Sequence, residues 1–397
     1  MRRSAQAAGD PTNTPDYRTR VYRSIAEIGE SKWDLLLPEH ARRQPFVRHA
    51  FLSLLESTAC VGGGTGWLPL HLGIERAGEL VAVAPLYAKT HSYGEYVFDW
   101  AWAEAYQRHG LRYFPKLLSA IPFSPVPGPR LLARDDGARD ALARAMIDFA
   151  GSQGLSSLHV LFPQENEASS LVAAGATLRH GVQFHWQNDG WHDFDGFLNS
   201  LRQDKRKKIR AERRRVAESG ISFERLAGTA ITEAHWQFFH RCYAATYGAH
   251  HSTPYLNEAF FLGLGERMSE ATLMIIASEG SNPIAASLLL HDGRRLYGRH
   301  WGALVHRPML HFETCYYQAI EHAIEEGFEA IEGGAQGEHK MARGFVPVRT
   351  VSAHWLAEPA FADAVERYLT REGRAISGYM DELSERTPFR SGPDSKR

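Results

Sequence analysis

Two hydrophobic periods run through this chain and predict a fold that mixes helices with strands. Apolar runs at residues 70–74 and 81–86 are typical of strands, and the turn Arg76-Ala77-Gly78 between them predicts an antiparallel hairpin. Residues 311–326 follow a helical period, and Gly327 suits the end of that helix. The apolar face of the helix consists of Phe312, Tyr316, Ala319, Ile320, Ala323 and Ile324. Residues 328–332 then predict a further strand.

The same order of elements occurs twice, at a nearly constant spacing of 203 residues. The helix after the first strand carries Ile28, Glu30, Trp33 and Leu36 in one copy and Ile231, Glu233, Trp236 and Phe239 in the other. The hairpin residues Leu70, Leu72, Val81, Ala82 and Leu86 match Leu273, Ile275, Ile284, Ala285 and Leu289. One residue out of register, Tyr93-Gly94 matches Tyr297-Gly298 at the expected start of a further strand. We therefore expect a duplicated order of strand, helix, hairpin, strand, helix and strand; two unrelated α+β domains are the alternative.

Composition allows two such domains. The chain has 397 residues, of which 44% are hydrophobic and 23% charged, enough for two substantial cores. The ends, residues 1–16 and 387–397, are polar and lack apolar periodicity, so we expect them to be disordered tails. No apolar segment follows Met1-Arg2-Arg3, and no run approaches the roughly 20 residues that cross a bilayer. These features favour a cytoplasmic protein without an integral membrane segment.

Positive charge is concentrated in one segment. Residues 202–215 hold nine Lys/Arg against Asp204 and Glu212, a local charge of +7 in a chain whose net charge is −1. Leu201, Ile209 and Val216 share one face of the predicted helix 201–216, which leaves the cations solvated. Such a helix binds the phosphates of tRNA or an anionic headgroup, or is simply a soluble face. The polyanion-binding candidates are Lys205, Arg206, Arg210 and Arg213.

Cysteine and histidine spacing gives no sign of a metal. Cys60, Cys242 and Cys315 are too scattered for a disulfide framework or a zinc motif. His250-His251 has no Cys or carboxylate cluster nearby. We expect no metal and no tightly bound cofactor.

Two segments of uncommon residue types carry a family resemblance. Residues 333–345 read GGAQGEHKMARGF, and residues 92–99 read SYGEYVFD, followed by Trp102, Tyr106, residues 113–117 and Pro122-Phe123. Both resemble the FemAB-like family of the acyl-N-acyltransferase (GNAT) superfamily, often labelled peptidoglycan biosynthesis or recognition, over about residues 20–385. The resemblance implies tandem GNAT-like domains, each a splayed mixed sheet flanked by helices, which we place at residues 17–190 and 191–386. It also implies amide formation on an amine, with aminoacyl-tRNA as donor in the Fem transferases and acyl-CoA in other relatives.

The glycine-rich motif offers the groups that amide transfer needs. Glu332, Glu338 and His339 follow an expected strand and are candidate proton acceptors, and Lys340 completes the catalytic set. Arg343 and Lys340 suit a phosphate or carboxylate. Arg299 and His300 on the neighbouring strand are further substrate-binding candidates, although His300 and Trp301 point to opposite sides of a regular strand. The plainer alternative is a turn followed by a solvated helix start.

The first copy gathers polar aromatic and charged residues that we assign to the acceptor pocket. They are Tyr93, Glu95, Tyr96, Asp99, Trp102 and Lys116. Rings that stack on apolar faces and carboxylates that accept hydrogen bonds are typical of sugar- or peptide-binding surfaces. A polar core between the two domains gives the same sequence pattern.

We therefore predict an N-acyltransferase that joins an activated acyl or aminoacyl group to a small-molecule or peptide amine. The phosphate-binding pattern of acetyl-CoA enzymes occurs only at residues 225–230, after the first strand of the second copy, which favours aminoacyl-tRNA over acyl-CoA as co-substrate. The rival is a non-catalytic recognition protein that binds a cell-wall or lipid-linked fragment. A nucleic-acid-binding module built on residues 202–215 is the third alternative. The sequence defines neither the acyl group nor the oligomeric state.

Overall fold

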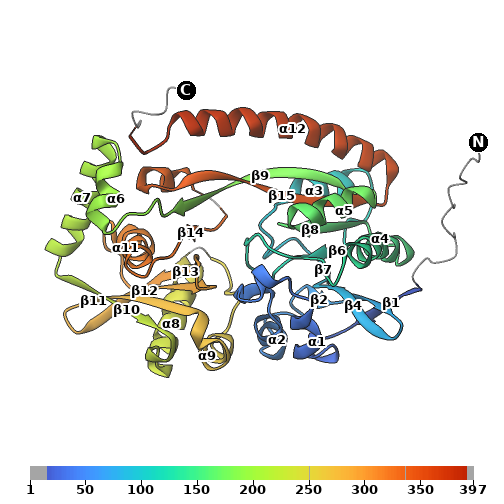
Figure 1. Cartoon of the computed structure of the whole chain (residues 1–397), viewed down its shortest axis with the longest axis horizontal. Coiled ribbons are helices and arrows are strands. Elements are labelled where there is room, and N and C mark those ends of the chain that lie inside the picture. Colours follow the sequence, from blue (N-terminus) through green and yellow to red (C-terminus); the bar gives the residue numbers. More distant parts are fainter. Residues whose placement is uncertain (1–15, 250, 336, 391–397) are drawn as a thin grey trace, which may run out of the picture.

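The computed structural model describes residues 16–249, 251–335 and 337–390 and has two sheets (Figure 1). The smaller sheet has the strand order β1-β3-β4-β7, and the larger has the order β10-β11-β12-β13-β14-β9-β15-β8-β6-β5-β2. Helices cover both sheets, which is the mixed α+β architecture that the sequence predicts. Of the expected N-terminal tail, residues 1–15 lie outside the described residues, and Asp16 directly precedes β1.

The first copy runs from β1 to β9. Its elements are β1 (Tyr17–Tyr22), α1 (Glu30–Leu35), α2 (His49–Ser57), β2 (Trp67–Pro69), β3 (His71–Arg76), β4 (Glu79–Ala84), β5 (Tyr87–Lys89), α3 (Trp100–Arg108), β6 (Lys116–Ser119), β7 (Leu132–Ala133), α4 (Asp136–Ser152), β8 (Ser157–Leu161), α5 (Glu165–Ala173) and β9 (Thr177–Gln187). Trp33 is fully buried on α1, and β3 and β4 form the expected antiparallel hairpin.

The second copy follows two linking helices, α6 (Phe194–Ser200) and α7 (Gln203–Glu218). Its elements are β10 (Ile221–Ala227), α8 (Glu233–Ala249), α9 (Glu258–Arg267), β11 (Thr272–Glu279), β12 (Asn282–His291), β13 (Arg295–Ala303), α10 (Leu310–Phe312), the π-helical segment η6 (Glu313–Tyr317), α11 (Gln318–Glu325), β14 (Ala330–Glu332), the 3₁₀ helix η7 (Glu338–Arg343) and β15 (Val346–Leu356). The helix predicted at residues 311–326 is confirmed, and Gly327 ends it with a φ of +73°.

The duplication is confirmed, but one of its correspondences is wrong. Tyr93-Gly94 lies in a loop and not on a strand. The first-copy partner of β13 is β7, because β7 pairs antiparallel with the hairpin strand β4 as β13 does with β12. Residues 85–131, which contain β5, α3 and β6, intervene between the hairpin and β7. This insertion breaks the constant spacing, and similarity between two short aromatic segments concealed it.

The two copies exchange their last strands. β9, which ends the first copy, pairs with β14 of the second, while β15, which ends the second copy, pairs with β8 of the first. β9 and β15 also pair with each other antiparallel, from Thr177 opposite His354 to His185 opposite Val346. Figure 1 shows this ribbon crossing between the two halves of the molecule. The exchange makes one continuous sheet of eleven strands.

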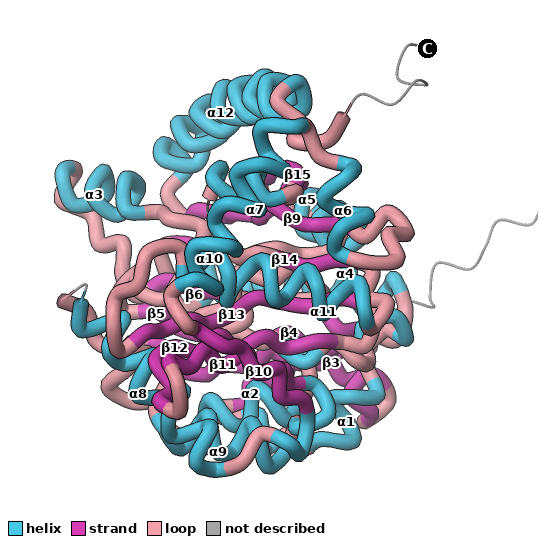
Figure 2. The backbone as a smooth tube through the Cα atoms, turned by 90° about the vertical axis from the view of Figure 1, so that its left-hand side faces the viewer, coloured by secondary structure: helices cyan, strands magenta, loops and turns pink. Residues whose placement is uncertain are grey.

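The C-terminal helix α12 (Pro359–Glu385) lies over the exchanged strands (Figures 1 and 2). Its residues Val365 and Leu369 pack in a cluster with Trp102, Tyr106 and Tyr113. Of the expected C-terminal tail, residues 387–390 follow α12 and pair with the α6–α7 junction, where Phe389 bridges to Leu201. Residues 391–397 lie outside the described residues. In the described part of the chain, no helix is both long and apolar enough to cross a membrane.

Candidate functional site

The sheet of the second copy opens between β13 and β14. The two strands pair in parallel only where residues 295–297 face residues 330–332. Arg299 is then an extra residue in β13, because Leu289 faces Gly298 while Leu288 faces His300. A bulge of this kind bends the strand that contains it. The sheet therefore opens directly after Tyr297 and Glu332, as the splayed-sheet prediction requires.

Beyond Glu332 the chain makes a glycine turn. Gly334 and Gly337 have φ values of +80° and +124°, a region that other residues rarely adopt. A Cβ atom on Gly333 would lie 3.1 Å from both the Lys340 side chain and the Phe345 ring. The turn thus depends on its glycines and brings Lys340 back against the end of β14. Gln336 of this motif lies outside the described residues.

Glu332 is a buried carboxylate at the closed end of the opening. Its exposed fraction is 7%, and Oε2 has no hydrogen-bond partner among the described residues. The nearest cation is Arg295, whose Nη1 lies 3.6 Å from Oε1. Burial raises the pKa of Glu332 to about 7, more than Arg295 lowers it. A carboxylate in this condition can take up a proton near neutral pH.

The other predicted residues of the motif have different surroundings. Lys340 is buried and donates a hydrogen bond to the carbonyl of Gly333, and burial lowers its pKa to about 8. His339 is exposed, and its Nε2 lies 3.2 Å from the Tyr316 hydroxyl. Glu338 is exposed and accepts a hydrogen bond from Tyr379 of α12. Lys340 therefore fixes the turn, while His339 and Glu338 lie at its outer surface.

Arg343 is held inside the protein. It donates to both carboxylate oxygens of Glu212 on α7, at 3.1 and 3.0 Å, and its guanidinium lies 3.5 Å from the centre of the Phe312 ring. Only 2% of the residue is exposed. Arg343 thus joins the glycine-rich motif to α7, which we call the basic helix.

The residues of β13 divide between two faces. Arg299 donates to the carbonyl of Phe123 at 2.6 Å and thereby contacts the first copy. His300 packs against the rings of Tyr243 and Phe261 on α8 and α9, and burial lowers its pKa well below the usual range. Trp301 points the other way, into a cavity of about 600 Å³ that also involves Leu304, Pro308, His311 and Phe312. Of the neighbouring pair His300 and Trp301, the structure places the tryptophan at a cavity.

The charged candidates of the first copy form a buried network. Lys116 donates to Glu95 at 2.7 Å and to Asp99, and Tyr113 donates to Asp99 at 2.6 Å. Burial alone would raise the pKa of Asp99, but the Lys116 ammonium holds it well below its usual range. For Glu95, burial prevails and raises the pKa to about 7. The arrangement matches the alternative of a polar core.

Two histidines extend this network across the exchanged strands. Tyr113 lies 3.0 Å from His159 Nε2 on β8, and the Nδ1 atoms of His159 and His354 on β15 are 2.7 Å apart. One Nδ1–H donates to the other, so both rings cannot be charged there. Burial lowers the pKa of His159 to about 3. Trp102 packs edge-on against His354, which places this candidate in the core as well.

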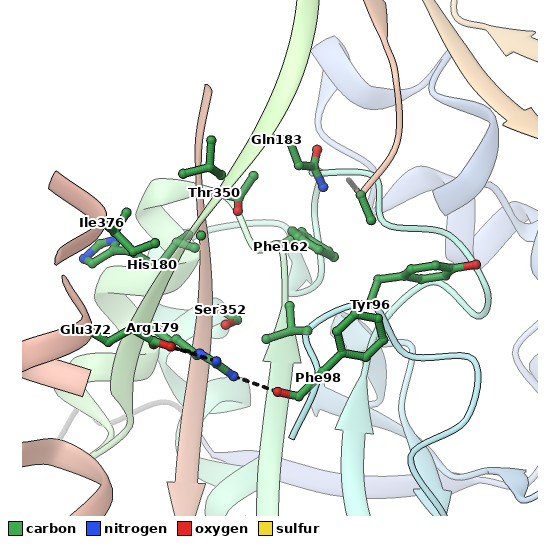
Figure 3. Close-up of a pocket in the computed structure, with 15 residues that line it drawn as sticks. Tyr96, Phe98, Phe162, Arg179, His180, Gln183, Thr350, Ser352, Glu372 and Ile376 are labelled. Carbon is green, nitrogen blue, oxygen red and sulfur yellow. Dashed lines mark hydrogen bonds and ion pairs between the residues drawn. The ribbon is translucent and has the colours of Figure 1, made fainter. Parts of the chain in front are cut away.

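Tyr96 and Tyr93 are the first-copy candidates that stay accessible. Tyr96 lines a cavity of about 260 Å³ beside β9 and β15, together with Phe162, Gln183 and Ala335 of the glycine turn (Figure 3). Arg179 closes one side by pairing with Glu372 and donating to the carbonyl of Phe98. Tyr93 is 58% exposed and stacks edge-on against Trp100. This cavity brings the two motifs of the chain together.

The basic helix α7 buries Ile209 and Val216, two residues of the apolar face that the sequence predicts. Leu201 is also buried, but it precedes the helix, which begins at Gln203 and ends at Glu218 where the prediction was residues 201–216. Its candidate cations differ in availability. Arg213 pairs with Glu313 and Glu321 and is partly buried, and it is therefore engaged within the protein. Lys205 pairs with Asp204, Arg210 pairs with Asp195 at 3.2 Å, and Arg206 is half-buried. Lys207, Lys208 and Arg215, which were not among the candidates, are exposed.

Sequence reasoning missed a third cavity, which lies beside Glu332. It lies between the copies, has a volume of about 260 Å³, and involves Gln44 of the first copy and Tyr297 and Arg295 of the second. Gln44 lies between Arg43 and Pro45 in a polar segment, and nothing in that segment indicates a distant partner. The described residues contain no group of three or more side chains placed for a metal ion, and His250 lies outside them.

Comparison with known proteins gives a family and a fold. The model of the FemAB-like family, described as peptidoglycan biosynthesis/recognition, matches residues 24–391. No curated protein matches. A conserved protein of unknown function from Bacteroides thetaiotaomicron is similar in structure, with 10% identity over 85% of this chain and 100% of that chain and a TM-score of 0.52. FemX has 12% identity over 85% and 98% of the chains, with a TM-score of 0.48. A tandem GNAT protein from the clavulanic acid pathway has 11% identity over 87% and 99%, with a TM-score of 0.46.

Proposed function

Because the chain belongs to the FemAB-like family, we propose that it is an N-acyltransferase that joins an activated acyl or aminoacyl group to an amine. One observation carries the proposal: the sheet of the second copy opens at a bulge, and a buried carboxylate without a hydrogen-bond partner among the described residues lies at the closed end of the opening. The facing edges of β13 and β14 no longer pair with each other beyond this point. In this proposal an extended acyl chain lies along these unpaired edges, where backbone groups can hold it.

The reaction requires little covalent help from the protein. The amine nitrogen attacks the acyl carbonyl carbon, the N–C bond forms, and the C–O or C–S bond to the carrier breaks. An ammonium acceptor first gives one proton to the Glu332 carboxylate, which later releases it to solvent. The second amine proton leaves on the carrier hydroxyl or thiol. Glu332 is the proton acceptor that the geometry favours, and His339 is the second candidate.

The remaining candidates have supporting roles in this proposal. Lys340 holds the glycine turn through the Gly333 carbonyl. Arg343 couples that turn to the basic helix through Glu212. We assign the Trp301 cavity to the donor. The partly exposed Tyr96 cavity suits the distal part of the acceptor.

We favour aminoacyl-tRNA as donor because exposed lysines and arginines of α7 lie next to the helix face that contacts the motif. Acyl-CoA is the alternative donor. A reaction with either donor is placed in the cytoplasm, where both carriers are made. The involvement of peptidoglycan follows from the family description and belongs to the same proposal.

The test is a transfer assay with separated donors. The protein is incubated with a charged tRNA mixture or with a panel of acyl-CoAs, together with a panel of primary amines, and amide products are identified by mass spectrometry. We expect product from one donor class, and loss of most of the rate in Glu332→Gln but not in the exposed control Glu326→Gln. Tight binding of an amine-bearing cell-wall fragment without any product would instead support a recognition protein.

A further inference from the structure

The cavity between Gln44 and Glu332, which we name the interface cavity, is built by both copies. Gln44, Gly128 and Gln164 come from the first copy, and Asp292, Tyr297 and Glu332 come from the second. Glu332 and Tyr297 are neighbours on parallel strands and share a face of the sheet. The cavity therefore opens at the same carboxylate that closes the gap between β13 and β14.

Two buried acceptors in this cavity lack donors. Glu332 Oε2 and Gln44 Oε1 are both buried without a hydrogen-bond partner within the described part of the chain. The exposed fractions of these residues are 7% and 8%. The Gln44 amide cannot be reversed without loss, because its Nε2 donates to the Pro127 carbonyl at 2.8 Å. Burying an acceptor without a donor is unfavourable and uncommon in proteins, so two in one cavity point to a ligand that supplies the donors.

Of the donors around the cavity, the Tyr297 hydroxyl is already engaged. The Tyr297 hydroxyl donates to Asp292 Oδ2 at 2.7 Å. Asp292 Oδ1 accepts the backbone N–H groups of Arg294 and Arg295, at 2.8 and 2.7 Å. The Arg295 guanidinium stays 3.6 Å from Glu332 and is partly exposed. The cavity thus presents two acceptors without donors, one of them a carboxylate oxygen, with the Arg295 guanidinium at its edge.

The cavity also depends on a glycine. A Cβ atom at position 128 would lie 2.3 Å from Gln44 Oε1 and would displace the amide. Gly128 is buried, and its N–H donates to the Phe162 carbonyl, so the backbone there has little freedom to shift. The oxygen of Gln44 is therefore accommodated only because residue 128 has no side chain.

From this complementarity we infer that the interface cavity binds the primary amino group of the acceptor, between Glu332 and Gln44. An alkylammonium group supplies N–H donors and a positive charge, which match two acceptors of which one belongs to a carboxylate. Glu332 takes one proton and leaves a neutral amine beside the gap that holds the acyl group. The inference rests on the proposed function in one respect, because it calls the bound amine the acceptor of the acyl group. Binding of an amine in the cavity does not itself require acyl transfer.

The experiment measures binding of propylamine hydrochloride to the full chain by titration calorimetry at constant ionic strength. Tetramethylammonium, which has the charge but no N–H donor, and propanol, which has a donor but no charge, are the probe controls. We expect only propylamine to bind, with a dissociation constant about tenfold higher in Glu332→Gln and raised severalfold in Gln44→Leu. The exposed variant Glu326→Gln should bind propylamine as the native protein does.

The outcomes separate this inference from the proposed function. Equal propylamine binding by the native protein and by both cavity variants overturns the inference, as does equally tight binding of tetramethylammonium. The same holds if amide formation proceeds with an unchanged KM for propylamine in both variants, while the proposed function then stands. Binding that depends on Glu332, without amide formation from any donor, supports the amine site and overturns the transferase. Circular dichroism and thermal unfolding show that each variant folds.

Discussion

At the scale of single residues, the buried carboxylate of Glu332 lowers the stability of the folded protein and is also the proposed proton acceptor. Its pKa is about 7 in the folded protein against 4.5 for an ordinary glutamate, so the folded state holds the proton more tightly. The unfolded state releases its proton first as the pH rises from about 4.5 to about 7, and the native protein loses stability over this window. The loss is on the order of 3 kcal/mol and is complete above about pH 7.

The replacement Glu332→Gln should remove this loss. We expect the variant to match the native protein near pH 4.5 and to be more stable at pH 8, by on the order of 3 kcal/mol, in urea unfolding at a series of pH values. Glu95 titrates over the same window in both proteins, so its contribution cancels in the difference. A stability difference that does not grow between pH 4.5 and 7 would contradict the assignment of a raised pKa to Glu332.

Substitution of Lys116 tests whether the buried network of Lys116, Glu95 and Asp99 stabilises the fold or binds a ligand. Lys116→Met leaves the Asp99 and Glu95 carboxylates buried without their main cation, and we expect it to lower the free energy of unfolding by about 3–5 kcal/mol. The triple variant that adds Asp99→Asn and Glu95→Gln should recover part of this loss in denaturant unfolding. Tyr93→Ala, on the exposed loop next to this network, should leave stability within about 0.5 kcal/mol of the native value. An equally stable Lys116→Met protein would show that the network is not structural.

At the scale of elements, the basic helix α7 carries some cations that are exposed and others that form ion pairs within the protein. Reversal of Lys207 and Lys208 to Glu should abolish retention on immobilised tRNA and leave the thermal midpoint unchanged, because both side chains are exposed. Arg213→Glu places a carboxylate against Glu313 and Glu321 and should lower the midpoint instead. Retention measured at several salt concentrations should weaken steeply as salt rises. Retention that survives the Lys207/Lys208 reversal would contradict a polyanion role for α7.

The sequence predicted helices and hairpins well, but its clearest error also concerns the secondary-structure elements. The helix 311–326, the hairpins and the apolar face of α7 follow from local periodicity, because each is stabilised by burial of one face. The partner of β13 was misassigned because β7 has two residues and no periodicity of its own. For the site, the glycine turn identifies Glu332 by adjacency. Gln44 could not be found, since only tertiary folding brings it to Glu332.

At the scale of the whole molecule, the exchanged strands bear on the proposed division at residues 190 and 191. Residues 16–190 retain β8 and β9 but lack β15, which lies between them in the sheet. Residues 191–390 retain β14 and β15 but lack β9, which lies between those two. Each half thus contains the sequence of a complete copy and still has an unfilled place in its sheet, with backbone donors and acceptors left unpaired there.

We therefore expect neither half to fold alone, and both to assemble when produced together. Separately expressed fragments 16–190 and 191–390 should lack a cooperative thermal transition, whereas co-expressed fragments should purify as a one-to-one complex with a single transition. The matched control is the full chain cut at a protease site inserted near Asp189, in the loop after β9, which keeps both strands in place. If the separate halves each unfold cooperatively as monomers, the exchange is not required for folding. Joint folding would also explain how a site between the copies keeps Gln44 and Glu332 in register, since the ribbon of β9 and β15 fixes both halves to one sheet.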